Sequence, residues 1–481
     1  MSDLTGTEGD KMKKEVFKAI VAAVLAVALA VCITACRKTG TDEVSGYHVT
    51  PCGKIRLQYY EEINGASERA VNAWVNSFRA GYPDVTVQVE YIHDHPDFQT
   101  SIAARSLGDV VSVLLADVPQ YVSEYGALRA LDVFAEALEI SLDDVDPTVL
   151  NSCMVNGRVY AAPCMSDRFV LKYNRDLVKA AGLADPVELE AKNEWTWDVF
   201  KEYCRALTFA DESGRAVGCS LQLGNSGIYI PFMEGFGGHW YDREFWQEHE
   251  ELRFISDEHV VEGIQEMISL VESNICKYTM SKYFPAVVKT EGQKALADYD
   301  AETEIAFNDV TFFDFGKTGK AYEEKGVDWN VVSMPRFPVP KTGLYATGFA
   351  VFGGTRNQDA AAALCLSIVT REGQSVYCSQ DGRTIPCIKS LAEGKTWRLS
   401  YPDISDDPVN GKNYDAFIRH PEDATAGMVE AVLPVKVATI VNRYMSTLVP
   451  DVVNGTKDLT SILTALETEA NEALKEINDN S

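Results

Sequence analysis

The chain has 481 residues, of which 46% are hydrophobic and 24% are charged, a composition typical of a globular protein with about two to four domains. Its formal net charge is −27, and so acidic a chain is repelled by phosphate backbones, which argues against a nucleic-acid partner. The 11 cysteines form no C-x-x-C pair and match no zinc-module spacing. We interpret them as small apolar core residues, with disulfide bonds as the alternative.

The first segment combines a basic stretch, "KMKKEVFK" at 11–18, with an unbroken apolar run at 19–31. The run is shorter than the roughly 20 residues that a transmembrane helix needs. A basic start, a short apolar run and an exit of small residues are typical of a signal peptide, so we expect residues 1–35 to be removed. Because the residues before Lys11 lack this character, we expect Met12 to be the true start.

The sequence Ile33-Thr34-Ala35-Cys36 resembles the lipobox of bacterial lipoproteins. That resemblance implies cleavage before Cys36 and a diacylglycerol on its sulfur, which places the mature chain on the outer face of the bacterial cytoplasmic membrane. A plain signal peptide with a coincidental cysteine is the alternative. Residues 36–52 are small, polar and aperiodic, so we expect a lipid-anchored flexible stalk.

The mature chain then begins with alternating strand and helix patterns. Residues 55–60 alternate as in a half-buried strand, residues 70–78 carry apolar side chains at helical spacing, and residues 85–91 alternate again. The continuous apolar run at 109–116 predicts a strand buried on both faces. This order of strands and helices predicts an α/β fold with open sheets and crossover helices.

A second unit of the same kind follows. We expect a strand at 168–174, a short helix at 176–181 that Gly182 ends, and a helix at 196–208 that Thr196 caps. Later segments at 304–309, 329–335 and 348–354 are predicted strands, and 357–369 is a predicted helix. The region from about 426 predicts two helices split near 450–455, of which the last spans roughly 457–477.

Several blocks resemble the extracellular solute-binding proteins of the sugar-binding kind, which serve ABC importers. The most specific is "GRVYAAPCMSDRFVLKYNRDLVKAAGL" at 157–183, which follows the family's G-x-x-Y-G-x-P and Y-N patterns except that Ala161 replaces the usual glycine. "YYEEINGASERAVNAWVNSFRAGYPDVTVQVEY" is similar to the opening of that family. At 108–110 the family's proline is missing. Matching blocks occur in family order from about 54 to 390.

The resemblance implies a two-lobed periplasmic-binding-protein-like fold, with two open α/β sheets joined by a hinge and a ligand cleft between them. It implies residues 53–164 plus 336–372 for lobe one and 165–335 plus 373–481 for lobe two. It further implies a protein that captures a carbohydrate by hinge closure and delivers it to membrane permease subunits. We expect a monomer without cofactor or catalytic activity.

Sugars present hydroxyl groups and apolar C–H faces, so a sugar site needs aromatic rings to stack on and polar side chains that form paired hydrogen bonds. We looked for both at strand ends and at the crossings between lobes. For each candidate, ordinary core packing or a solvated turn is the alternative. The candidate ligand-binding residues are Tyr60, Glu61, Asn64, Asp117, Ser166, Asp167, Phe236, Trp240, Tyr241, Asn308, Asp309, Tyr345, Asp381 and Arg383.

Other functions have weaker support in the sequence. Adjacent carboxylates such as Glu61 and Glu62 point apart on a strand, so they cannot flank one glycosidic bond, and no G-x-S-x-G, H-E-x-x-H or P-loop motif occurs. His93 and His95 have a spacing at which two histidines can share a zinc ion, but a site needs three or four ligands. A polyamine or peptide ligand and a sensor or adhesion role without transport stay open.

Overall fold

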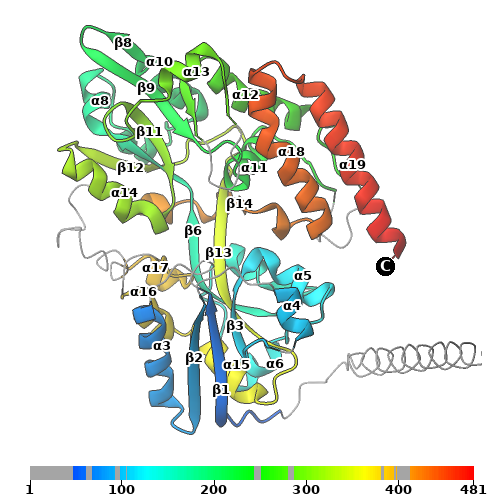
Figure 1. Ribbon diagram of the computed structural model, residues 1–481. Helices are drawn as coiled ribbons and strands as arrows, with labels where there is room; N and C mark the ends of the chain where they lie inside the picture. Colours follow the sequence, from blue (N-terminus) through cyan, green and yellow to red (C-terminus); the bar gives the residue numbers. More distant parts are fainter. Residues whose placement is uncertain are drawn as a thin grey trace, which may run out of the picture. The chain divides into compact units, whose positions relative to one another are not determined.

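Three parallel strands form one side of the first of two large sheets: β1 (Gly53–Tyr60), β2 (Val85–Ile92) and β3 (Val110–Leu114). The computed structural model describes residues 47–60, 68–92, 98–104, 106–242, 251–279, 287–380, 384–394, 397 and 412–480. The order of the first sheet is β14-β13-β3-β1-β2, with β6 (Ala161–Arg168) paired to β13 (Thr342–Val351) and β14 (Ala424–Ala426) at the edge. Figure 1 shows this sheet in the lower half of the view.

Helices cover the first sheet because their apolar residues recur every three or four positions. In α3 (Glu68–Gly81) the buried residues include Val71, Trp74 and Phe78, as the helical spacing predicts. The Trp74 ring lies 4.6 Å from the ring of Phe349 on β13. Helix α15 (Gln358–Ser367) also packs against strands of this sheet.

The second sheet has the order β10-β9-β11-β7-β12, with β8 (Phe209–Asp211) beside β9. Its strands are β7 (Val170–Asn174), β9 (Gly214–Leu221), β10 (Cys276–Tyr278), β11 (Ile305–Val310) and β12 (Trp329–Ser333). Helix α10 (Trp197–Ala206) begins where predicted, because the Thr196 hydroxyl accepts a hydrogen bond from the Val199 N–H at 3.4 Å. The two sheets, each with its helices, form two lobes of mixed α/β structure, as the sequence predicts.

Three of the described segments run between the two lobes. Strand β6 of the first sheet continues into β7 of the second with only Phe169 between them. Residues 334–341 lead from β12 back to β13, and residues 418–423 lead to β14. We call β6, β13 and β14 together the crossing ribbon, which stands at the centre of Figure 1.

The boundary expected at residue 373 differs from the packing observed. Helix α16 (Arg371–Cys378) packs against α3 of the first lobe, where the Tyr377 ring lies edge-on to Trp74 at 6.3 Å. Ile385 and Cys387 are also buried in the core of the first lobe. The short connection from α15 to α16 keeps this segment beside the sheet that α15 covers.

Two helices end the described chain, α18 (Val435–Val453) and α19 (Leu459–Asn480), and they pack against each other. The two helices are expected to separate near 450–455. The observed break lies between Val453 and Leu459, because Pro450 is inside α18. The helix ends before Gly455, whose φ of 66° is a backbone conformation that glycine adopts readily.

The remaining helices and strands have the following bounds. The helical ones are α4 (Phe98–Ala103), η1 (Leu115–Asp117), α5 (Val118–Ser123), α6 (Asp132–Ala137), α7 (Pro147–Asn151), α8 (Arg175–Ala180), α9 (Pro186–Ala191), α11 (Ser226–Gly235), α12 (Glu258–Glu272), α13 (Glu291–Leu296), α14 (Phe312–Glu324), α17 (Lys389–Ala392), η4 (Tyr414–Phe417), η5 (Pro421–Asp423) and η6 (Val429–Ala431). Strands β4 (Met154–Val155) and β5 (Arg158–Val159) form a separate pair.

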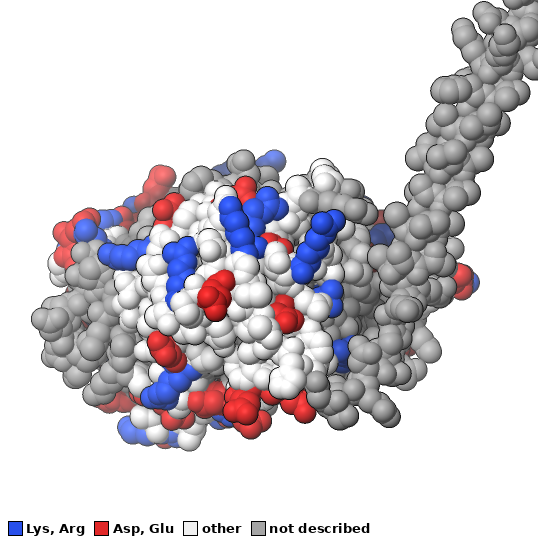
Figure 2. Space-filling model, turned by 90° about the horizontal axis from the view of Figure 1, so that it is seen from below, with Lys and Arg blue, Asp and Glu red and all other residues white. Residues whose placement is uncertain are grey.

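The surface and the cysteines agree with the composition. All nine cysteines among the described residues are free, and all but Cys52 are buried, as expected for small core residues. Figure 2 shows acidic and basic side chains interspersed on the face seen from below. Within the ranges given above, no helix combines the length and apolar character needed to span a membrane, and no group of three or more acidic, histidine or cysteine side chains is arranged to hold a metal ion.

Candidate functional site

Polar side chains from both lobes gather beside the crossing ribbon. Parallel strands bring their carboxyl ends to one edge of a sheet, and ligands bind at such edges in open α/β sheets. In the first lobe, η1 follows the carboxyl end of β3, and it contacts η6 of the second lobe. We therefore place the candidate cleft between the strand ends of the two sheets, next to this contact.

The first lobe contributes tyrosines and one carboxylate. Asp117, half-buried in η1, accepts a hydrogen bond from the Tyr121 hydroxyl at 3.2 Å. The rings of Tyr121 and Tyr125 stack with centroids 6.3 Å apart. Burial, followed by the charge of Asp117, raises the pKa of Tyr121, and burial also raises the pKa of Tyr60, whose side chain is only 3% exposed. This side offers aromatic surface beside an acceptor.

The second lobe contributes a connected set of amide, phenol and carboxyl groups. Asn225 caps α11 by accepting from the Gly227 N–H at 2.9 Å, and it also accepts from the Tyr345 hydroxyl at 3.0 Å. Asp309 accepts from the Gln222 backbone N–H at 3.2 Å and from its side-chain amide at 3.1 Å. Because burial outweighs these hydrogen bonds, the pKa of Asp309 rises to about 6.

A second carboxyl group, that of Glu430, comes shortly after β14 in the chain. Glu430 in η6 accepts from the Asn442 amide at 2.8 Å, and Asn442 in turn accepts from the Tyr229 hydroxyl at 2.8 Å. Burial raises the pKa of Glu430. Burial also raises the pKa of Tyr345 to about 12, and the charges of Glu430 and Asp309 add to that rise. Tyr345 therefore lies near two carboxyl groups.

Helix α11 approaches the ribbon closely because its second residue is a glycine, Gly227. A Cβ on Gly227 would lie 2.4 Å from Phe169 Cε2 and 3.0 Å from Tyr345 Cε2. The rings of Phe169 and Tyr345 meet edge-on at 5.7 Å. Only glycine leaves room for this packing, which fixes the position of Tyr345 relative to the Asn225 cap.

The two faces of the ribbon carry different chemistry. Asp167 and Arg168 are consecutive in β6, so their side chains point to opposite faces. Asp167 is opposite Tyr345 in the strand register and accepts from the Phe312 backbone N–H at 2.9 Å. Arg168 forms an ion pair with Asp146 at 3.3 Å, in which the side chains are 6% and 15% exposed. The cleft face is therefore the Asp167 face.

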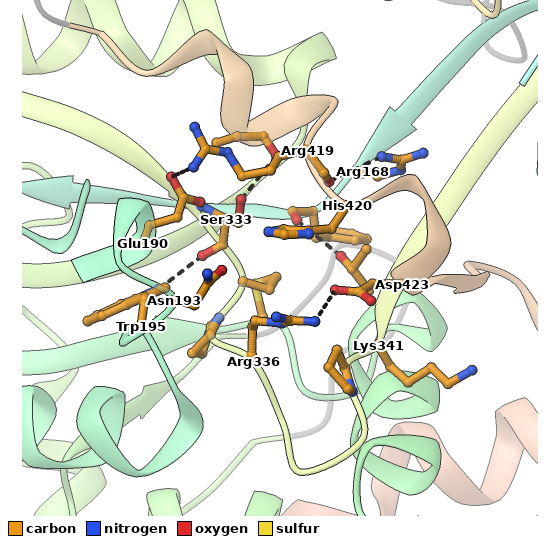
Figure 3. Close-up of a pocket in the computed structure, with 16 residues that line it drawn as sticks. Arg168, Glu190, Asn193, Trp195, Ser333, Arg336, Lys341, Arg419, His420 and Asp423 are labelled. Atoms are coloured by element: carbon orange, nitrogen blue, oxygen red, sulfur yellow. Dashed lines mark hydrogen bonds and ion pairs between the residues drawn. The ribbon is translucent and has the colours of Figure 1, made fainter. Parts of the chain in front are cut away.

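A pocket lies on the Arg168 face (Figure 3). It is bordered by Arg168 and Phe169 of the first crossing, by parts of 333–342, and by Arg419, His420 and Asp423 of the third crossing. Glu190, Asn193 and Trp195 complete its wall. None of the candidate ligand residues from the sequence lines this pocket.

Several of the residues expected in the cleft lie elsewhere in the structure. Trp240 is fully buried, donates to Glu234 at 3.0 Å and packs against Phe254, so the expectation that it stacks on a ligand is wrong for this conformation. Phe236 packs against Phe337 with ring centroids 5.8 Å apart, and Tyr241 is half-buried against Trp240. The aromatic residues of a glycine-rich loop can pack in a core as well as line a cleft.

Other expected residues have local partners or lie outside the described residues. Asn308 donates to the Ala301 carbonyl at 3.1 Å and faces the opposite side of the second sheet from Asp309. Ser166 is 9% exposed and lies on the Arg168 face, opposite Ala346. The calls outside the described residues are Cys36, Glu61, Asn64, His93, His95, Asp381 and Arg383.

Sequence reasoning proposed Asp117, Asp167, Asp309 and Tyr345 as candidates but did not single out the residues that contact or surround them. The missed residues are Tyr121, Tyr125, Gln222, Asn225, Glu430 and Asn442. Asn225 had a local signal, because an asparagine shortly after a strand and directly before a helix is a typical cap. The others had none, because their role depends on contacts across the ribbon.

Comparisons with known proteins point to one family. A family model described as bacterial extracellular solute-binding protein matches residues 63–365. A maltooligosaccharide ABC transporter solute-binding lipoprotein of Streptococcus pneumoniae is 24% identical over 373 residues, which cover 68% of this chain and 76% of that protein. A mannitol-binding protein of Pseudomonas aeruginosa is 28% identical over 112 residues, so the match spans only 24% of that protein and 23% of this chain.

Solved structures show the same fold at low identity. The sugar-binding protein MalE of Xanthomonas citri superposes with a TM-score of 0.66 at 16% identity, covering 88% of this chain and 98% of that one. The ABC substrate-binding protein Lmo0181 of Listeria monocytogenes, solved with cycloalternan, superposes with a TM-score of 0.65 at 18% identity, covering 88% and 99%. With a family match over well more than half of its length and two lobes built as described, the chain belongs to the bacterial extracellular solute-binding proteins.

Proposed function

We propose that this chain is the carbohydrate-binding lipoprotein of an ABC importer. The observation that carries the proposal is the group of hydrogen-bonded polar side chains near Tyr345, with Asn225 as its direct partner. These groups lie at the carboxyl ends of β9 and β11, where an open sheet binds its ligands. They are half-buried, so a solute in the cleft can reach them.

The chemistry of these groups suits a neutral polyhydroxyl ligand. Amide groups can donate to and accept from sugar hydroxyls, and carboxylates can accept from them. Tyr125, half-buried beside Tyr121, offers a ring face for sugar C–H groups. The relatives named for maltooligosaccharide and cycloalternan support an oligosaccharide as the ligand class.

Closure of the two lobes would follow from binding between them. A ligand that touches both lobes binds the closed form better, so it shifts the population toward that form. The closed form would then dock on membrane permease subunits. In this proposal the mature protein is a monomer that starts at the lipidated Cys36 and stays on the outer face of the cytoplasmic membrane.

A thermal-shift screen of the mature protein tests the function. A ligand at 100 times its dissociation constant adds about 2.7 kcal/mol, which moves the melting temperature by a few degrees. Linear and cyclic malto-oligosaccharides are the main arm, mannitol is a second, and polyamines, peptides and zinc are separate arms. Selective shifts by sugars support the proposal, whereas shifts only by polyamines, peptides or zinc would replace the ligand class. If nothing binds, the sensor or adhesion role becomes the better hypothesis.

A further inference from the structure

We propose that the pocket on the Arg168 face of the ribbon binds a small oxyanion, such as inorganic phosphate or a short carboxylate. The pocket lies behind the candidate sugar cleft, because β6 turns Asp167 toward the cleft and Arg168 away from it. It encloses about 550 Å³ of empty space, part of which is open to solvent. That space admits a phosphate-sized ligand without rearrangement.

The first argument is the charge of the lining. Four fixed cations border the pocket, Arg168, Arg336, Lys341 and Arg419, against the two carboxylates Glu190 and Asp423. His420 is also part of the wall, and its ring stands in the middle of the view in Figure 3. An excess of cations is unexpected on a chain with a net charge of −27, and it favours an anion at this place.

The second argument is that the carboxylates leave the guanidinium groups incompletely paired. Arg336 Nη2 lies 3.6 Å from Asp423 Oδ2, and Arg419 Nη1 lies 3.6 Å from Glu190 Oε2, both beyond good hydrogen-bond length. Glu190 already accepts from the Ser333 N–H at 3.0 Å and from the Asn413 amide at 2.7 Å. Its charge is thus shared among several donors.

The third argument is two buried donors that no acceptor satisfies. Within the described residues, neither the Nε of Arg168 nor that of Arg336 has a hydrogen-bond partner, although both atoms are buried. The remaining contacts of Arg168 are with Asp146 at 3.3 Å and the Arg419 carbonyl at 3.5 Å. A buried donor without an acceptor is costly, and an oxyanion has several acceptor lone pairs to offer guanidinium groups.

The burial of Asp423 also favours an anion in the pocket, because burial disfavours the charged form of this carboxyl group. Burial raises its pKa, and although Arg336 and His420 lower it, burial has the largest effect. Lys341 lies 3.8 Å from Glu234, outside the pocket wall, so this cation is at the edge of the proposed site. The core of the site is therefore Arg336, Arg419 and His420.

Because of the position of the pocket, an anion bound there would affect ligand binding in the cleft. All three segments that join the lobes line it: Phe169 in the first, Arg336 in the second and His420 in the third. If the lobes close on a ligand as proposed above, the spacing of these residues changes. Anion binding and cleft binding then alter each other's affinity by the same factor, because coupling between two sites is reciprocal. This part of the inference rests on the proposed function, but the anion site itself does not.

Calorimetric titration of the mature protein with inorganic phosphate, in the absence of any sugar, tests the site. Sulfate and malonate form separate arms, and sodium chloride at matched ionic strength is the control for screening. We expect saturable binding of at least one oxyanion, and binding about tenfold weaker or more in Arg336→Gln and in His420→Gln, since the first removes a guanidinium donor and the second removes the imidazole from the pocket wall. Lys436→Gln, which removes an exposed ion pair with Glu476 on the C-terminal helices, should leave binding unchanged.

The outcomes are distinct. A heat signal that chloride reproduces, or equal affinity in wild type, Arg336→Gln and His420→Gln, overturns the site. If Arg336→Gln fails to fold by circular dichroism, Arg419→Gln takes its place in the same comparison. Phosphate binding without any sugar response leaves the anion site standing and counts against the proposed function. Where both bind, an unchanged sugar affinity at saturating phosphate overturns the coupling alone.

Discussion

Asp167 and Arg168 are neighbours in β6, yet they serve opposite faces of the ribbon that joins the lobes. Asp167 accepts from the Phe312 N–H on the cleft face, while Arg168 pairs with Asp146 on the other face. Both side chains are at least nine-tenths buried. Asp167 thus joins β6 to α14 of the second lobe, while Arg168 holds the same strand to Asp146 of the first lobe.

Removal of the Tyr345 hydroxyl tests the cleft. Tyr345→Phe loses the hydrogen bond to Asn225 and should weaken ligand binding about three- to tenfold, in line with a net value near 1 kcal/mol per hydrogen bond. Calorimetry with the sugar found in the screen measures the change. Tyr444→Phe is the matched control, because its hydroxyl donates to Glu469 at 2.9 Å on the C-terminal helices. Equal loss in both variants would contradict the assignment of Tyr345.

Neutralisation of Asp146 tests the buried ion pair. Asp146→Asn keeps the side-chain oxygen that accepts from the Thr148 N–H but leaves Arg168 without its charge partner. Because an uncompensated buried charge is costly, we expect a loss of about 3 kcal/mol in the free energy of unfolding by urea. Lys436→Gln breaks an exposed pair and should change it by less than about 1 kcal/mol. A small effect of Asp146→Asn would show that Arg168 is held by other contacts.

The raised pKa of Asp309 predicts a pH dependence of stability. Between the ordinary carboxyl pKa near 4 and the folded pKa of about 6, the native state holds a proton that the unfolded state has released. Stability therefore falls as pH rises through this window, by an amount on the order of 2 kcal/mol from this group. Urea unfolding at pH 4.5 and pH 7 compares wild type with Asp309→Asn. The variant should show a smaller fall, and identical pH profiles would contradict the assignment.

A methyl group at Gly227 tests the close approach of α11 to the ribbon. Gly227→Ala forces its Cβ against Phe169, so we expect a loss of about 1–3 kcal/mol in stability, as for other overpacked positions. Gly81→Ala is the matched control, because a Cβ there meets nothing within 4 Å. That substitution should be neutral or stabilising by up to about 1 kcal/mol. Thermal unfolding of both variants decides the matter, and a neutral Gly227→Ala would show that Phe169 has room to move.

Much of the fold could be predicted because its signals are local. The apolar spacing in 70–78 and the Thr196 cap each lie within one or two helical turns, and both have the predicted structure. The alternation in 55–60 correctly placed Tyr59 in the core, where it is fully buried. Strand and helix order then led to two α/β lobes, and the family match confirms the resemblance drawn from the same segments.

The candidate site could be predicted only in part, because a sequence pattern does not say what a side chain meets. Trp240 and Tyr345 are both aromatic residues near glycines, yet one fills a core and the other lies near Asp309 and Glu430. The partners of Tyr345 and Asp309 are residues 120 and 87 positions away. Such pairs form only when elements distant in the chain have packed together.

By itself, the sequence determined the α/β order of elements and the family, because each depends on residues close together in the chain. Only the tertiary structure decided that α16 belongs to the first lobe, that Asp167 faces the cleft, and that Arg336, Arg419 and His420 share one pocket. The reason is physical. Periodicity separates the two faces of an element, but the partner of each face is chosen by packing between elements distant in sequence.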